Sequence, residues 1–250
     1  MTKVIPISAG IGNCFLVIEN TSIFLVDTGS KGFEYKIAKA ITSRGYNLSD
    51  LKFIFLTHTH YDHAGSAAKI KELTSAPIIV HESEVDYLVA GFHPMPKGTS
   101  LFYKIIIALG KFGNKTKNKV DAVTPDITFS DYYDLNKFGF DANIIHTPGH
   151  TKGSSCLIIN KNALVGDTLF NVFGSNYPPF ANDTKLLKYS WEVLLDENDV
   201  LFYYPAHGKR IKRDEFKMQG FKKINSLYHH LFPGKLSTNF IFKSGNDSTT

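Results

Sequence analysis

The chain has 250 residues, of which 43% are hydrophobic and 13% aromatic, enough to bury a sizeable core in one large domain or two small ones. Its formal net charge is +5, but the 28 lysines and arginines are spread along the chain, which disfavours a nucleic-acid partner. The N-terminal residues lack the apolar core of a signal peptide, and no apolar run is long enough to span a membrane, so we expect a soluble cytoplasmic protein.

Short runs of β-branched and aromatic residues alternate with turn residues and helical patterns up to residue 90. This alternation of strands and helices is typical of an α/β protein. In chain order the predicted elements are the strands Val4–Ile7, Cys14–Glu19 and Ile23–Val26, a helix Phe33–Arg44, a strand Phe53–Leu56, a helix Ser66–Leu73, a strand Ile78–Val80 and a helix Glu82–Ala90.

The pattern loosens between residues 91 and 123, where glycine, proline, lysine and asparagine interrupt the periodicity. We interpret this stretch as an insertion within one domain that spans residues 1–250. Its apolar piece, Leu101–Leu109, predicts a short amphipathic helix packed on the core, with a lid over the site or a surface contact as alternatives.

The second half resumes the alternation and ends in a polar tail at residues 243–250, which we expect to be mobile. Its predicted elements are the strands Ile127–Phe129, Ile144–His146, Cys156–Ile159 and Ala163–Val165, a helix Lys185–Asp196, a strand Val200–Tyr204 and a basic helix Asp214–Leu231. The two cysteines, Cys14 and Cys156, lie inside apolar runs, which predicts buried structural thiols.

Three imidazoles and a carboxylate follow the strand Phe53–Leu56 within six residues: His58, His60, Asp62 and His63. Side chains two apart in an extended segment share a face, so one loop can direct several of them at the same point. Four such groups packed together repel and desolvate one another unless a cation compensates. The run therefore predicts a metal site.

Three more residues of metal-ligand type follow apolar runs further along the chain: His150, Asp167 and His207. Loops that leave strands at one edge of a sheet gather into a site, so we expect these residues beside the first cluster. An ion that keeps a position open for chemistry takes three or four protein ligands, so the number of candidates favours two ions. His146 and Tyr61 lie nearby in sequence, and we interpret them as structural or peripheral.

The order of these motifs resembles that of the metallo-β-lactamase superfamily, in particular its glyoxalase II-like hydrolase branch. The residues that carry the resemblance are Asp27-Thr28-Gly29, His58-x-His60-x-Asp62-His63, Gly149-His150, Gly166-Asp167 and Ala206-His207-Gly208. The resemblance implies a four-layer αβ/βα sandwich with metals at one edge.

It also implies a partition of the ligands. His58, His60 and His150 bind one ion, Asp62, His63 and His207 bind the other, Asp167 bridges them, and Asp27 orients ligands without touching metal. Two divalent ions, zinc first with iron and manganese as alternatives, would then activate a bridging hydroxide, and Asp62 could relay a proton.

Departures from subfamily patterns narrow the chemistry. The bridging Asp167 and the absence of a signal peptide disfavour antibiotic hydrolysis, and Phe170 stands where acyl-homoserine lactonases carry a tyrosine. We therefore predict a hydrolase that cleaves an ester, thioester or lactone of a small molecule. The alternatives are a mono-iron persulfide dioxygenase, then a phosphodiesterase or nuclease, and last a binding protein with a vestigial site. Basic residues that could hold an acidic substrate are Lys209, Arg210, Lys212, Lys222 and Lys223.

Overall fold

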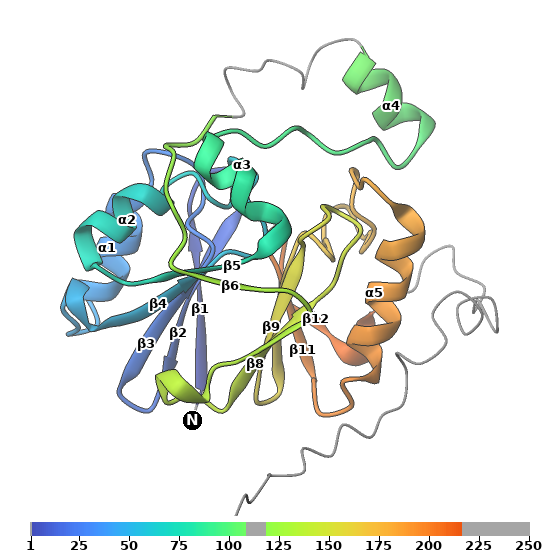
Figure 1. Ribbon diagram of the computed structural model, residues 1–250. Helices are drawn as coiled ribbons and strands as arrows, with labels where there is room; N and C mark the ends of the chain where they lie inside the picture. Colours follow the sequence, from blue (N-terminus) through green and yellow to red (C-terminus); the bar gives the residue numbers. More distant parts are fainter. Residues whose placement is uncertain (1, 109–118, 217–250) are drawn as a thin grey trace, which may run out of the picture. The chain divides into compact units, whose positions relative to one another are not determined.

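The computed structural model describes residues 2–108 and 119–216 (Figure 1). The first of its two six-stranded sheets is antiparallel across its first three strands and parallel across the rest, because helices connect the later strands. In spatial order its strands are β1 (Thr2–Ser8), β2 (Asn13–Glu19), β3 (Ser22–Val26), β4 (Leu51–Phe55), β5 (Ile78–His81) and β6 (Ile127–Phe129).

The second sheet is antiparallel except for one parallel pair, β10 and β11, which is joined through a helix. Its strands in spatial order are β12 (Ile211–Lys212), β11 (Phe202–Pro205), β10 (Asn162–Gly166), β9 (Ser155–Ile159), β8 (Ala142–His146) and β7 (Tyr132–Asp134).

Helices cover the outer face of each sheet (Figure 1). The helices α1 (Glu34–Thr42), α2 (Ala67–Thr74) and α3 (Val85–Ala90) lie on the side of the first sheet, and α5 (Thr184–Asp196) lies on the side of the second. This arrangement confirms the expected α/β class and the αβ/βα sandwich. Single 3-10 turns occur at Leu48–Asp50, Glu82–Glu84, Asn136–Phe138 and Arg213–Glu215.

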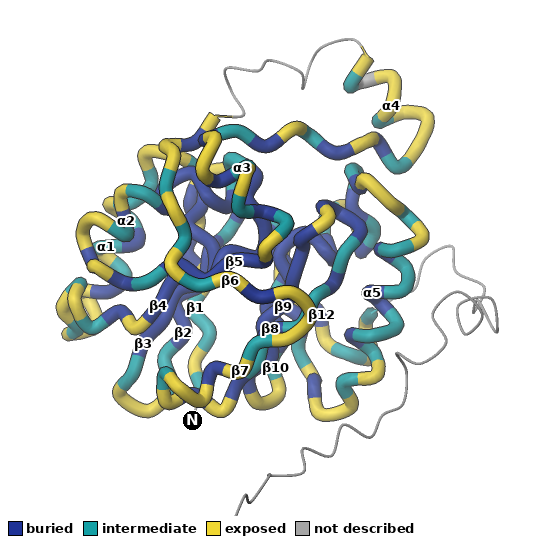
Figure 2. Tube along the Cα trace, in the orientation of Figure 1, coloured by how far each residue is buried: buried dark blue, intermediate teal, exposed yellow. Residues whose placement is uncertain are grey.

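Alternate residues of the first sheet face two different cores. In β3, Ile23 and Leu25 belong to the cluster beneath the helices, whereas Phe24 and Val26 belong to the cluster between the two sheets. This follows from the two-residue period of a strand, and it explains why these strands read as continuous apolar runs. Figure 2 colours most residues of the inner strands dark blue, as buried.

Phe24 is a central residue of the core between the sheets. Its ring stacks on Phe53 at 4.6 Å and meets Phe140, in the connection between β7 and β8, edge-on at 4.8 Å. We expect Phe24→Ala to lower the free energy of unfolding by about 3–5 kcal/mol in a denaturant titration, because a buried cavity forms. The control Phe102→Ala, at a side chain that is 66% exposed, should change it by less than about 0.5 kcal/mol. Equal effects of the two variants would contradict this assignment of the core.

The structure differs from the predicted elements mainly at short strands. It adds β7 and β12, which the sequence did not indicate, and it begins the strand predicted at Val200–Tyr204 at Phe202. Of the basic helix predicted at Asp214–Leu231, only residues 214–216 are described, and Asp214 and Glu215 belong to the 3-10 turn Arg213–Glu215. The rest of this prediction, like the tail at 243–250, lies outside the described residues.

The segment 91–123 contains one helix within its described part, α4 (Leu101–Ala108). Leu101, Phe102 and Ile105 are 74%, 66% and 50% exposed, so these three side chains of α4 do not pack on the core as expected. Hydrogen bonds from Thr99 to the carbonyls of Pro178 and Pro179 join the approach to α4 to the loop before α5. The interpretation of this segment as an insertion stays a prediction.

Candidate metal centre

Four loops meet at one edge of the two sheets. The first loop, residues 56–66, leaves β4, and the second, residues 147–154, leaves β8. The other two follow β10 and β11, which are parallel and therefore end at the same edge. The alternating directions of β8, β9 and β10 place the end of β8 at this edge too. The topology thus brings ligand-type residues from distant parts of the chain together.

The seven residues singled out as ligands lie in one cluster. Their side chains form three overlapping groups in which the ligand atoms lie within 4.8 Å of one another. These groups are His58 with His60 and His150, His58 with His63 and Asp167, and Asp62 with His63 and His207. We call the first the three-histidine group and the last the outer group.

The carboxylate of Asp167 lies between these groups. Its Oδ2 is 3.3 Å from Nε2 of His150, and its Oδ1 is 3.3 Å from Nε2 of both His63 and His207. One oxygen therefore faces the three-histidine group and the other faces the outer group. A carboxylate in this position is suited to contact two cations at once.

Buried polar atoms without a hydrogen-bond partner indicate whether the cluster is suited to a cation. Among the described residues, His58 Nε2, His63 Nε2 and Asp167 Oδ1 are buried and have no hydrogen-bond partner. Each such atom costs about 1–3 kcal/mol if nothing satisfies it. Neighbouring ligand atoms lie 3.0–3.4 Å apart, as between His60 Nδ1 and His150 Nε2, and between His207 Nε2 and Asp62 Oδ2. Ligands of tetrahedral zinc would be roughly 3.3 Å apart, so the donor set fits a divalent metal.

Backbone carbonyls fix the orientation of two of the histidines. Nε2 of His60 donates to the carbonyl of Pro94 at 3.2 Å, which leaves its Nδ1 facing the cluster. Nδ1 of His150 donates to the carbonyl of Phe180 at 2.9 Å, which leaves its Nε2 facing the cluster. A carbonyl can only accept, so each contact also fixes the tautomer of the ring.

Asp27 is positioned to orient two more histidines. Its Oδ2 is 2.8 Å from Nδ1 of His63, and it accepts the hydroxyl of Thr57, whose oxygen lies 3.2 Å from Nδ1 of His58. Asp27 is itself fully buried and adopts a positive φ of 58° at the end of β3. It therefore lies behind the ligand atoms, where an orienting residue is required.

Burial and neighbouring charges set the protonation of the rings. Burial, with the neighbouring imidazoles of His63 and His60, holds the pKa of His58 well below its usual range. Burial also lowers the pKa of His60 and of His150, so these rings are neutral, the form that binds metal. Burial lowers the pKa of His63 too, but the carboxylates of Asp167 and Asp27 outweigh it and raise that pKa well above its usual range.

Other side chains named from the sequence lie outside the metal-capable groups. His146 donates from Nε2 to the carbonyl of Lys152 and stacks on His81 at 4.1 Å, and Phe170 stacks on His207 at 4.6 Å. Both cysteines are free and buried, and burial raises the pKa of Cys156 to about 12. Among the proposed basic residues, Lys209, Arg210 and Lys212 are exposed, whereas Lys222 and Lys223 lie outside the described residues.

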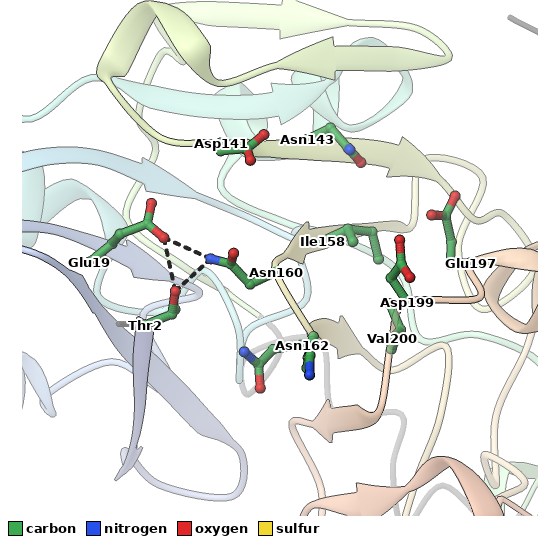
Figure 3. Close-up of a pocket in the computed structure, with 11 residues that line it drawn as sticks. Thr2, Glu19, Asp141, Asn143, Ile158, Asn160, Asn162, Glu197, Asp199 and Val200 are labelled. Atoms are coloured by element: carbon green, nitrogen blue, oxygen red, sulfur yellow. Dashed lines mark hydrogen bonds between the residues drawn. The ribbon is translucent and has the colours of Figure 1, made fainter.

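A pocket of about 790 Å³ lies away from this cluster, at the opposite ends of the strands (Figure 3). Its lining includes Asn162, which begins β10, whereas Asp167 follows the end of that strand. Figure 3 shows Asn160 bonded to both Thr2 and Glu19 at its rim, at 2.6 and 2.7 Å. The pocket therefore does not form part of the candidate metal centre.

The αβ/βα sandwich with this cluster at its sheet edge defines a class, the metal-dependent hydrolases of the metallo-β-lactamase fold. Residues 7–207 match the family model described as the metallo-beta-lactamase superfamily. The chain belongs to this superfamily. It is accordingly a metal-dependent hydrolase with a histidine and aspartate cluster that can hold divalent metal.

Curated relatives cover most of the chain. A probable metallo-hydrolase of Methanocaldococcus jannaschii, MJ0888, is 27% identical over 200 residues, which are 79% of this chain and 87% of the relative. The hydroxyacylglutathione hydrolase GloC of Haemophilus influenzae is 28% identical over 212 residues, which are 82% of this chain and 90% of the relative.

Solved structures show the same fold at lower identity. The BLEG-1 B3 metallo-beta-lactamase has a TM-score of 0.64 and 20% identity, covering 86% of this chain and 95% of the other. The metallo-beta-lactamase family protein TTHA1429 of Thermus thermophilus has a TM-score of 0.62 and 21% identity, covering 84% and 74%. Among the residues that the structure describes, no helix is both long and apolar enough to cross a membrane.

Proposed function

We propose that the chain is a binuclear hydrolase that cleaves an ester, thioester or lactone bond of a small molecule. The three-histidine group would hold one ion, the outer group would hold the second, and Asp167 would bridge them. The observation that carries the proposal is the placement of Asp167, whose two oxygens lie 3.3 Å from ligand nitrogens on opposite sides. Divalent ions held by these residues would supply Lewis acidity and would lower the pKa of bound water to about 7.

Exposure indicates the side from which substrate approaches. The side chains of Asp62 and His207 are each 12% exposed, whereas that of His63 is fully buried. The outer group therefore faces the open side of the cluster. Asp62 lies there with Oδ2 3.4 Å from His207 Nε2, in a position to accept or pass on a proton from the attacking water.

The names of two relatives support the finer assignments. GloC is a hydroxyacylglutathione hydrolase, which makes acyl-glutathione thioesters the first substrates to test. A relative in Bacillus subtilis, PksB, 22% identical over 159 residues, is named a probable zinc-dependent hydrolase, which supports zinc as the metal. Iron and manganese remain alternatives because the same nitrogen and oxygen donors bind them.

The test is metal analysis of the full-length protein, purified with and without oxygen, together with a substrate panel. We expect about two zinc ions per chain and turnover of at least one acyl thioester, ester or lactone. Removal of metal by a chelator should abolish turnover, and added zinc should restore it. One iron per chain with oxygen uptake on a persulfide would overturn the proposal, as would turnover of a phosphodiester alone.

A further inference from the structure

Glu84 is a buried carboxylate that no motif of the sequence singles out. It ends the 3-10 turn Glu82–Glu84, which precedes α3, and its side chain is fully buried. A buried charge is costly unless several donors compensate it. Burial raises the pKa of Glu84, but hydrogen bonds from His93, Thr59 and Thr151 outweigh that effect and leave it at about 2. Glu84 is therefore ionised at neutral pH.

The two oxygens of Glu84 contact the two loops that carry the three-histidine group. Oε2 accepts the N–H of Thr59 at 3.0 Å and its hydroxyl at 2.6 Å. Oε1 accepts the hydroxyl of Thr151 at 2.7 Å and the N–H of Gly153 at 3.1 Å. Thr59 lies between His58 and His60 in the first loop, and Thr151 directly follows His150 in the second.

Glu84 also holds a ring that packs against a candidate ligand. Nδ1 of His93 lies 3.1 Å from Oε2 of Glu84. The ring of His93 stacks on Tyr87 at 3.9 Å with an interplanar angle of 8°, and it also lies 4.4 Å from the ring of His60. The carboxylate thus acts on the position of His60 through the backbone of the adjacent Thr59 and through the ring of His93.

The second loop approaches Glu84 so closely that it needs a glycine. A Cβ added to Gly153 would lie 2.5 Å from Cγ of Glu84 and 3.0 Å from Nδ1 of His81. The loop is therefore packed directly against this carboxylate, and its position is set there.

We propose that Glu84 is a positioning residue that sets the distance between the two loops of the three-histidine group. The first loop comes from one sheet and the second from the other, so strand pairing does not fix their separation. A backbone hydrogen bond from Ser155 to the carbonyl of Thr57, at 3.0 Å, joins the start of the first loop to the residue after the second, and Glu84 joins them further along, beside His60 and His150. The Glu84 carboxylate supplies that link through four donors, two on each loop. The inference rests on the metal site of the proposed function, because its consequence is tighter binding of one of the two ions.

The test compares Glu84→Gln with Glu82→Gln in the full-length, metal-free protein. Glu82 is exposed on the same turn, so its variant removes the same charge without touching the loops. In Glu84→Gln an amide group faces N–H or hydroxyl donors and repels them. We expect Glu84→Gln to show faster amide hydrogen exchange in residues 57–64 and 147–154. It should also bind one Co²⁺ ion about 10- to 100-fold more weakly, as measured by the visible absorption of bound Co²⁺. Binding of the second ion should change little.

Glu84→Asp keeps the charge with a shorter reach, so it should restore part of the Co²⁺ affinity. Equal affinity and exchange in Glu84→Gln and Glu82→Gln would overturn the inference, and so would an equal loss at both ions, which indicates general destabilisation. If Glu84→Gln does not fold, Thr151→Val replaces it, and Co²⁺ affinity identical to that of the unmodified protein would overturn the inference. Failure of the unmodified protein to bind Co²⁺ would instead refute the proposed function, while hydrogen exchange still tests the link between the loops.

Discussion

Replacing Asp167 by alanine is expected to lower kcat/KM on the best substrate of the panel by about 10³-fold or more. The variant removes both carboxylate oxygens, one of which faces His150 while the other faces His63 and His207. Metal-ion catalysis supplies several kcal/mol of transition-state stabilisation, and each 1.4 kcal/mol corresponds to about tenfold in rate. Steady-state kinetics and metal content, measured on the same preparation, check the result.

The control for this variant is Asp86→Ala, at an exposed position on α3. It should retain full activity and the full metal content. The overall fold of Asp167→Ala should persist, because the apolar cores beneath the helices and between the sheets do not include this residue. Retention of full turnover by Asp167→Ala would refute the assignment of Asp167 to the site.

Gly149→Val is expected to lower the free energy of unfolding by about 3 kcal/mol or more and to displace the loop that carries His150. Gly149 has a φ of 138°, which residues other than glycine rarely adopt, and the strain of another residue there costs about 1–3 kcal/mol. A Cβ there would also lie 2.5 Å from Cα of Leu187 in α5, a backbone atom that cannot move freely. Denaturant titration in the presence of a chelator measures the effect on the protein alone.

Gly139→Ala separates the effect of backbone strain from that of the steric clash with α5. Gly139 also has a positive φ, 82°, but no atom within 4 Å of an added Cβ. Its variant should therefore show only the backbone strain, about 1–2 kcal/mol, and should leave Co²⁺ binding intact. If Gly149→Val and Gly139→Ala were equally destabilising, the close approach of the second loop to α5 would have no energetic role.

Strands that form continuous runs of apolar residues were predictable from the sequence. The strands at residues 14–19, 23–26 and 156–159 are apolar on both faces, so their runs stand out from the turns around them. The strands β7 and β12 were missed because they are two or three residues long, carry polar residues and form only by pairing with a neighbour. No local pattern marks such an edge strand.

The candidate ligands were also predictable, because the chain has only 10 histidines and the clustering of several of them with carboxylates needs a physical reason. Their supporting contacts were not. The carbonyls of Pro94 and Phe180 carry no residue-type signal, since every residue has a carbonyl. Glu82 and Glu84 are equivalent in the sequence, yet the first is exposed and the second buried. Only the fold of the two loops around Glu84 distinguishes them.

The meeting of the four loops at one edge has a consequence for folding. Each of the three metal-capable groups found among the described residues combines residues that precede β6 with residues that follow β7, so none of them is complete in one half of the chain. A metal can therefore bind in the proposed site only after the two halves of the chain have docked. By linkage, each tenfold rise in free metal above its Kd would raise the free energy needed to separate the two halves by about 1.4 kcal/mol per ion. The free energy of unfolding would then depend on the concentration of free metal around the protein.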